Sequence, residues 1–439
     1  MGRGRLQALL RNAGILLSGN VVGAGLAFVA SMLAARTLGP SALGQIALIQ
    51  SVIYAVDRLV NFQSWRTLIR YGADALEEGS PESFRQVTSF SVLLDVSSAL
   101  LGALVSAIAV WALSLHYGWS RELTTLGYVY SAGVAANLIG TPIGLLRLFD
   151  QFGLLAQHRV VSGVAKLTGV TGAALLSPHP ETILAVWIGM DLFSWGYLMW
   201  LAWRAYRARG YAWPSLRSVA GIRARHEGIV SFALVTNITL SIRAGAKELD
   251  QMLVGTLLSA HALGLYRVAK SFGGIVGQLQ DPLMHAVYPE LARRFAARDS
   301  AGFADTLRAT ARLTFFAGPA VFAGFYFGAD LLLLLSAGPE FLEARETLIV
   351  YAGVLCFLFM FFYVNSAMLA LGKANWPLVA SIVGTLVFFV TIGPLTGRFG
   401  VVGAAWAQAA LYGVWMTIML AALAREWRLW RESLEAEHA

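Results

Sequence analysis

Nine cationic side chains of this 439-residue sequence fall inside stretches that are apolar enough to cross a bilayer. They are Arg58, Arg159, Lys166, Arg243, Lys247, Arg267, Lys270, Arg308 and Arg312. Where one stretch holds two of them, the spacing is three, four or seven residues, which places both on one face of a helix. An uncompensated Arg or Lys at mid-bilayer costs about 2.5–3.5 kcal/mol, so we expect a wet interior or acidic partners around them. A cationic interior favours an anionic cargo.

The stretches that position these cations predict an all-α polytopic membrane protein. Hydrophobic residues make up 57% of the chain, charged residues make up 13%, and the mean hydropathy is +0.64, which excludes a soluble enzyme domain. Each predicted span is near the ~20 residues that cross hydrocarbon. The twelve spans are 13–35, 42–62, 86–113, 124–148, 152–176, 182–203, 228–254, 261–286, 304–327, 345–371, 375–396 and 399–424.

The basic residues outside the spans predict the orientation of the chain. Twenty of the 33 Lys and Arg residues fall in the termini and the even-numbered loops, whereas four fall in the odd-numbered loops. Because cytoplasmic loops are enriched in Lys and Arg, both termini are predicted to be cytoplasmic. The net charge of +8 then reflects topology, and nucleic-acid binding is not expected.

A polar stretch at 204–227 with six arginines predicts a basic cytoplasmic linker between two six-helix lobes, 1–203 and 228–439. The lobes contain a weak repeat. The segment 41–47 resembles 261–267 at an offset of 220, Phe84 corresponds to Phe303, and Phe152 corresponds to Trp376. Chance similarity in apolar, Gly- and Ala-rich sequence is the alternative. Repeats with an even number of spans share one orientation, and substrate sites in such transporters lie between the repeats.

Several short motifs occur in the order and spacing of a known family. The segment 35–40 (ARTLGP) followed by Gly44 resembles the end of the first helix in Wzx-type oligosaccharide flippases of the multidrug/oligosaccharidyl-lipid/polysaccharide exporter superfamily, relatives of the lipid II flippase. The second half is similar to the same family in its D-x4-G-x8-G-x-Y-x2-A pattern and in three later motifs. These are Asp250, Gly255, Gly264, Tyr266 and Ala269, then 289–291, 336–341 and 369–373.

This resemblance implies a flippase that carries an undecaprenyl-diphosphate-linked oligosaccharide from the cytoplasmic to the outer leaflet of the bacterial inner membrane. It implies two six-helix bundles, related by a pseudo-two-fold repeat, around a V-shaped central cavity that alternates its opening. The expected partners are the lipid-linked substrate, membrane lipids and other proteins of polysaccharide assembly, and the expected state is a monomer. O-antigen, capsule and other exported glycans all stay open as cargo.

The diphosphate of such a cargo gives the intramembrane cations a role, because guanidinium groups bind phosphate oxygens in a bidentate manner. The residues expected to contact the cargo are Arg58, Arg243, Lys247, Arg267 and Lys270. The secondary candidates, on helices farther from the expected lobe interface, are Arg159, Lys166, Arg308 and Arg312.

The alternative for each cation is an internal salt bridge, since the spans also contain Asp57, Asp95, Asp191, Glu248 and Asp281. An intramembrane Asp without a cationic partner is also a candidate ion-coupling residue, and Asp57, Asp95, Asp191 and Asp281 are the candidates. We expect no cofactor, metal site or nucleotide site. An H⁺ or Na⁺ gradient or removal of product on the outer side would supply the energy.

Two other functions compete with the flippase. A cation-coupled multidrug exporter of the same superfamily should have acids in its cavity, whereas the first span here has none and cations are in excess. A membrane polysaccharide polymerase or ligase usually has a large outer loop. The longest odd-numbered loop here, 328–344, is short.

Overall fold

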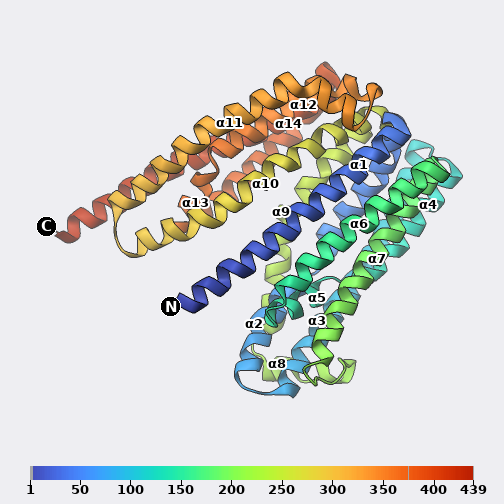
Figure 1. The fold of residues 1–439 in the computed structure, drawn as a ribbon. Coiled ribbons are helices and arrows are strands. Elements are labelled where there is room, and N and C mark those ends of the chain that lie inside the picture. Colours follow the sequence, from blue (N-terminus) through green and yellow to red (C-terminus); the bar gives the residue numbers. More distant parts are fainter. Residues whose placement is uncertain (1–2, 374, 439) are drawn as a thin grey trace. The chain divides into compact units, whose positions relative to one another are not determined.

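Helices account for almost all of the regular structure in the computed structural model (Figure 1). The structure describes the backbone of residues 3–373 and 375–438, and side chains over the same residues except 3–13, 235, 238–248, 281, 282, 285, 437 and 438. Within these ranges there is no strand. The α-helices are α1 (Arg3–Val60), α2 (Ser64–Glu77), α3 (Pro81–Tyr117), α4 (Arg121–Gly133), α5 (Gly140–Leu148), α6 (Phe152–Leu176), α7 (Pro180–Arg207), α8 (Ile222–Arg225), α9 (Ile229–Leu257), α10 (Ala260–Ala296), α11 (Ser300–Ser336), α12 (Arg345–Met360), α13 (Phe362–Ala370) and α14 (Asn375–His438). Short 3₁₀ turns occur at Val134–Ala136, Leu216–Val219 and Pro339–Ala344.

Eight helical segments of the described residues are long and apolar enough to cross a membrane. They are Gly14–Glu77, Pro81–Tyr117, Arg121–Leu148, Phe152–Leu176, Pro180–Arg207, Ser300–Ser336, Pro339–Ala370 and Asn375–Ala436. The first and last each accommodate two predicted spans, because the helical backbone is interrupted at Gly39 in α1 and at Gly400 in α14. With α9 and α10 added, this order agrees with the predicted all-α polytopic fold.

The chain divides into two compact units. The N-terminal unit comprises Met1–Leu38 and Ile46–Met252, and the C-terminal unit comprises Gly39–Gln45 and Leu253–Ala439. In the N-terminal unit, α6 packs along α7, and α3 packs along α4 (Figure 1). In the C-terminal unit, α10, α11, α12 and α14 run alongside one another.

The basic segment that follows α7 packs on α3 within the N-terminal unit. Arg85 Nε donates to the Trp213 carbonyl at 2.9 Å, and Gln86 Nε2 donates to the Ala220 carbonyl at 2.9 Å. The His226 ring lies 3.2 Å from the Ser83 hydroxyl. Ile222 and Ile229 also join the apolar core formed with Phe84 and Tyr206. The segment 213–229 is therefore a packed part of this unit.

The repeated motif meets its own copy in the C-terminal unit. A Cβ atom on Gly44 would collide with the Ala260 carbonyl, and a Cβ atom on Gly264 would collide with the Pro40 carbonyl. Ser41 Oγ lies 3.3 Å from His261 Nδ1. Pro40, Ser41 and Gly44 correspond to Ala260, His261 and Gly264 at the offset of 220 residues, so the three contacts are symmetric between the two copies. The repeat therefore has a packing reason: two helix starts approach closely only where both lack a side chain.

The second pair of repeated positions also shares a local structure. Ser80 caps α3 by accepting a bond from the Ser83 backbone N–H at 3.3 Å, and Asp299 caps α11 by accepting one from Gly302 N–H at 2.8 Å. Phe84 and Phe303 follow these caps by four residues, and both are fully buried. The two halves therefore correspond in a helix cap and in a buried phenylalanine as well as in sequence.

Candidate functional site

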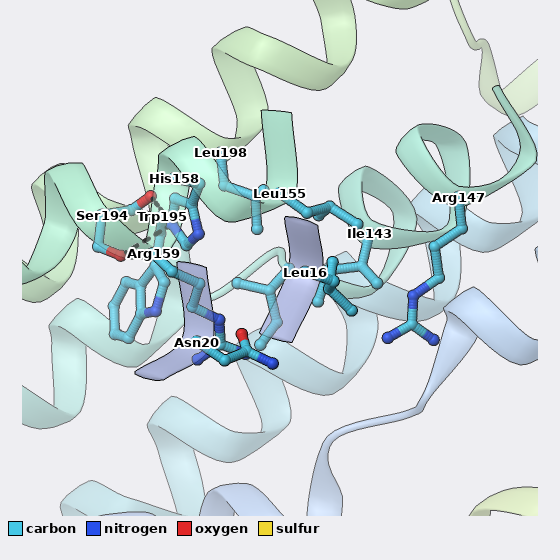
Figure 2. A pocket seen from close by; sticks show the side chains of 11 residues that line it. Leu16, Asn20, Ile143, Arg147, Leu155, His158, Arg159, Ser194, Trp195 and Leu198 are labelled. Carbon is cyan, nitrogen blue, oxygen red and sulfur yellow. Dashed lines mark hydrogen bonds between the residues drawn. The ribbon is translucent and has the colours of Figure 1, made fainter. Parts of the chain in front are cut away.

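A pocket of about 230 Å³ opens in the N-terminal unit between α1, α5, α6 and α7 (Figure 2). Its polar lining consists of Asn20, Arg147, His158, Arg159 and Ser194, together with the indole of Trp195. Its apolar lining consists of Leu16, Ile139, Ile143, Leu155 and Leu198. Among the residues that the structure describes, the lining contains two arginines and no carboxylate, so the pocket is cationic.

Helical spacing places the polar residues at this pocket. His158 and Arg159 lie about two turns into α6, and Asn20 comes from the early part of α1. The His158 Nε2 atom lies 3.0 Å from Ser194 Oγ on α7, which joins the two helices. Figure 2 shows Arg159 beside Asn20 and Arg147 at the other end of the lining, beyond Ile143. Because α5 ends at Leu148, the Arg147 side chain lies at a helix end and can reach the pocket.

Asp95 fixes two of the helices next to this pocket. Its Oδ1 atom accepts a bond of 2.5 Å from the Ser64 hydroxyl at the start of α2, and its Oδ2 atom accepts one of 2.6 Å from the Thr141 backbone N–H at the start of α5. Asp95 is 2% exposed. A buried carboxylate that accepts two such bonds positions helices, and its geometry leaves it no direct access to the pocket.

Asp57 is bound by two amides. Its Oδ1 atom accepts from Asn61 Nδ2 at 3.1 Å and from Asn137 Nδ2 at 3.0 Å. Asn137 Oδ1 is buried and has no hydrogen-bond partner among the described residues. The neighbouring Arg58 is exposed at the end of α1 and forms no ion pair within the described part of the chain.

Asp191 is the centre of a polar chain across the N-terminal unit. Tyr54 and Tyr130 are joined through their hydroxyls at 2.8 Å, and the Tyr130 hydroxyl donates to Asp191 Oδ2 at 2.7 Å. Lys166 Nζ lies 3.7 Å from Asp191 Oδ1 and 5.7 Å from the centre of the Trp187 ring. Lys166 therefore has an acidic partner. For this residue the structure shows the internal salt bridge that the sequence analysis gave as the alternative to cargo contact.

Two residues predicted to contact the cargo, Arg243 and Lys247, lie on α9, where their side chains fall outside the described residues. The side chain of Asp281 also falls outside them. Arg267 and Lys270 lie one turn apart on α10, are half-buried, and each makes an interaction within the protein.

The secondary candidates of the C-terminal unit lie on α11. Arg308 is paired with Asp305 at 3.1 Å, and both side chains are exposed. Arg312 lines a second pocket of about 230 Å³, whose other lining residues include Phe315, Phe316 and Tyr363. This pocket is almost entirely apolar. Arg312 therefore lies beside an apolar surface that would suit acyl chains.

Sequence reasoning missed Arg147 as a site residue. It follows an apolar run directly, and the charge count assigned it to a cytoplasmic loop. The structure instead makes it part of α5 and of the pocket lining. Its position directly after Leu145 and Leu146 gave no sequence signal for this, because the sequence of one helix does not show which other helices it packs against.

The described fold is that of a polytopic all-α membrane protein, and several solved transporters share it. The lipid II flippase MurJ in an inward closed conformation shares the fold, with a TM-score of 0.74 and 12% identity over 94% of this chain and 89% of that one. A multidrug resistance MATE family transporter in an inward-facing conformation gives a TM-score of 0.70 at 14% identity, covering 93% and 96% of the two chains. A superfamily transporter from Pyrococcus furiosus, described by a reverse polarity of its binding pocket, gives 0.63 at 15% identity, covering 98% and 96%.

The family follows from the sequence match. The model of the polysaccharide biosynthesis protein family (Polysacc_synt) matches residues 9–295, and the MatE model matches residues 234–395. The inner membrane protein YghQ of Escherichia coli (strain K12) is 28% identical over 291 residues, which is 66% of this chain and 82% of that protein. The chain belongs to the polysaccharide biosynthesis protein family, within the superfamily of flippases and transporters that the sequence motifs resemble.

Proposed function

We propose that this protein moves an oligosaccharide, joined through a diphosphate to an undecaprenyl-type lipid, from the cytoplasmic to the outer leaflet by alternating access. The observation that carries the proposal is the pocket of the N-terminal unit, in which Arg147 and Arg159 face a lining without a carboxylate. Guanidinium groups bind phosphate oxygens strongly where water is largely excluded. The membership in the polysaccharide biosynthesis protein family supports a lipid-linked cargo.

The predicted orientation indicates which end of the pocket faces the cytoplasm. With both termini cytoplasmic, α6 begins at the cytoplasmic side, and Arg159 lies about two helical turns inside that end. The diphosphate would meet Arg159 after entering from the cytoplasmic leaflet. Arg243, Lys247, Arg267 and Lys270 would hold it in later steps, and Asp57 is the proposed residue for coupling to H⁺ or Na⁺ because amides surround it.

A cation-coupled multidrug exporter is the second candidate function. The match of the MatE model to residues 234–395 favours it. Organic cations require carboxylates or aromatic faces in their site. The acid-free lining of the pocket with Arg147 and Arg159 would repel such compounds, which is why we prefer the anionic cargo.

Leaflet exchange in reconstituted vesicles tests the proposal. The full chain is incorporated into vesicles with a fluorescent prenyl-diphosphate sugar, and arrival in the opposite leaflet is followed with a membrane-impermeant quencher. We expect exchange that falls at least about tenfold in Arg159→Ala, Arg243→Ala and Arg267→Ala. The control is Arg207→Ala, an exposed arginine that stacks on Trp213 at 5.4 Å. If no exchange occurs and the vesicles take up an organic cation, the multidrug exporter would be the supported function in place of the flippase.

A further inference from the structure

Three arginines converge beside the pocket from three helices. On α2, the Arg66 Cζ atom lies 4.6 Å from the centre of the Trp65 ring. On α5, the Arg147 Cζ atom lies 4.4 Å from the centre of the same ring. Two guanidinium groups therefore share one indole. Arg147 and Arg159 on α6 line the same pocket, so the two positive charges face one volume.

The described residues provide no acid to neutralise this cluster, which we call the arginine cluster (Arg66, Arg147 and Arg159). None of the three forms an ion pair within the described part of the chain. Arg66 Nε is buried, and no described residue accepts a hydrogen bond from it. Like charges held together at low dielectric destabilise the fold, and a buried donor without an acceptor adds to that cost. Both costs disappear when an anion occupies the cluster.

Two of the three helices that carry the cluster, α2 and α5, are fixed in place. Asp95 holds Ser64, the residue before Trp65, and also the first turn of α5, through bonds of 2.5 and 2.6 Å. The helices of Arg66 and Arg147 are thus positioned by a buried carboxylate on α3. A site whose donors are already positioned loses little entropy when a ligand binds.

The surroundings of the cluster indicate the class of ligand. Arg147 and Arg159 lie on one pocket lining whose remaining surface is formed largely by leucine and isoleucine side chains, with Asn20 as a neutral donor and acceptor. Separate guanidinium groups suit a ligand with two linked phosphates better than one with a single phosphate. The apolar lining suits the first part of a lipid chain.

We propose that Arg66, Arg147 and Arg159 form a capture site for the diphosphate of a prenyl-linked lipid on the cytoplasmic side of the N-terminal unit, before the lipid crosses. This inference rests on the proposed function, and it adds Arg66 and Trp65 to the residues proposed there. Phosphate groups could also come from anionic phospholipid headgroups, so the test separates the two sources.

Trp65 provides a direct readout, because an anion that draws the two guanidinium groups off its ring changes the emission of the indole. The full chain in nanodiscs of neutral lipid is titrated with farnesyl diphosphate, farnesyl phosphate, inorganic diphosphate or phosphatidylglycerol, and a Trp65→Phe variant identifies the signal. We expect saturable binding of farnesyl diphosphate, about tenfold or more tighter than binding of farnesyl phosphate or phosphatidylglycerol. Equal binding of phosphatidylglycerol would overturn the assignment to a diphosphate.

Substitutions assign the binding to the cluster. Arg66→Gln and Arg147→Gln should each weaken binding of farnesyl diphosphate at least about tenfold, Arg147→Lys should weaken it less, and Arg207→Gln should leave it unchanged. An unchanged thermal unfolding midpoint shows that each variant is folded. Arginine-dependent binding without leaflet exchange would overturn the proposed function and leave the capture site standing. Leaflet exchange with binding that is indifferent to Arg66 and Arg147 would overturn the capture site alone.

Discussion

The carboxylate of Asp95 accepts a hydrogen bond of 2.5 Å from the hydroxyl of Ser64 and so joins the middle of α3 to the start of α2. The same carboxylate accepts from the first turn of α5. An intramembrane aspartate that looks like an ion-coupling residue in the sequence thus has a positional role in the structure. Its two acceptor atoms hold the helices that carry Arg66 and Arg147.

Asp95→Ala should destabilise the N-terminal unit. The substitution leaves the Ser64 hydroxyl and the Thr141 N–H buried without an acceptor, at a cost of about 1–3 kcal/mol each. A thermal unfolding curve in detergent measures this as a lowered midpoint. Ser97→Ala on the exposed face of the same helix is the matched control, since that hydroxyl donates to the Leu94 carbonyl of its own helix. A midpoint equal to that of the control would show that Asp95 does not hold α2 and α5.

Lys166 and Asp191 should prove energetically coupled. Removing Lys166 alone leaves Asp191 with its bond from Tyr130, and removing Asp191 alone leaves the Lys166 charge beside Trp187. We expect Lys166→Met and Asp191→Asn each to destabilise the protein and the double variant to cost less than their sum, by about 0.5–3 kcal/mol. Denaturant unfolding of the four proteins gives this coupling energy. Strict additivity would mean that the ion pair contributes nothing.

Alanine at either repeated glycine should destabilise the C-terminal unit. The Cβ atom of Gly44→Ala or Gly264→Ala would overlap a backbone carbonyl of the partner segment, and backbone cannot move aside as a flexible side chain can. We expect each substitution to cost about 1–3 kcal/mol. Gly274→Ala is the control: it lies on α10 in open space, so it should be neutral or stabilise the helix by about 0.5–1 kcal/mol. Equal stability of all three variants would refute the close approach.

The packing of the segment 213–229 on α3 should weaken as the pH falls. Burial lowers the pKa of His226 below its usual value of 6.5, with a smaller contribution from the charge of Arg225. The neutral ring is therefore favoured when the segment is packed, and the released segment binds the extra proton. The stability that the neutral His226 ring contributes to the packed segment is fully present above pH about 6.5. It is lost as the pH falls from there toward the lowered pKa.

Hydrogen–deuterium exchange measures this effect. Peptides covering 213–229 should exchange faster at pH 5.5 than at pH 8 after correction for the intrinsic exchange rate. His226→Gln should abolish the difference, and His179→Gln, at an exposed histidine, should preserve it. A pH dependence that survives in His226→Gln would assign the effect to another group.

The helical order was predictable because hydropathy is a property of consecutive residues, and the breaks at Gly39 and Gly400 divide the two longest helices where separate spans were predicted. The arginine cluster was not predictable in this way. Arg66 follows a polar stretch, Arg147 follows an apolar run, and both count as loop charges in the sequence. Only the packing of their helices brings both guanidinium groups to the Trp65 ring. The ion pair of Lys166 with Asp191 and the bonds of Asp95 likewise depend on which helix faces meet, which a single sequence does not encode locally.

The contact at Gly44 and Gly264 is isologous within one chain. Gly44 meets Ala260 and Gly264 meets Pro40, and Ala260 is the residue that corresponds to Pro40 in the repeat. Ser41 faces its own equivalent, His261, near the local two-fold axis. Symmetric dimers are built in this way, with one surface patch serving as its own partner. One short motif therefore supplies both sides of this junction, so a change at either glycine acts on the same interface.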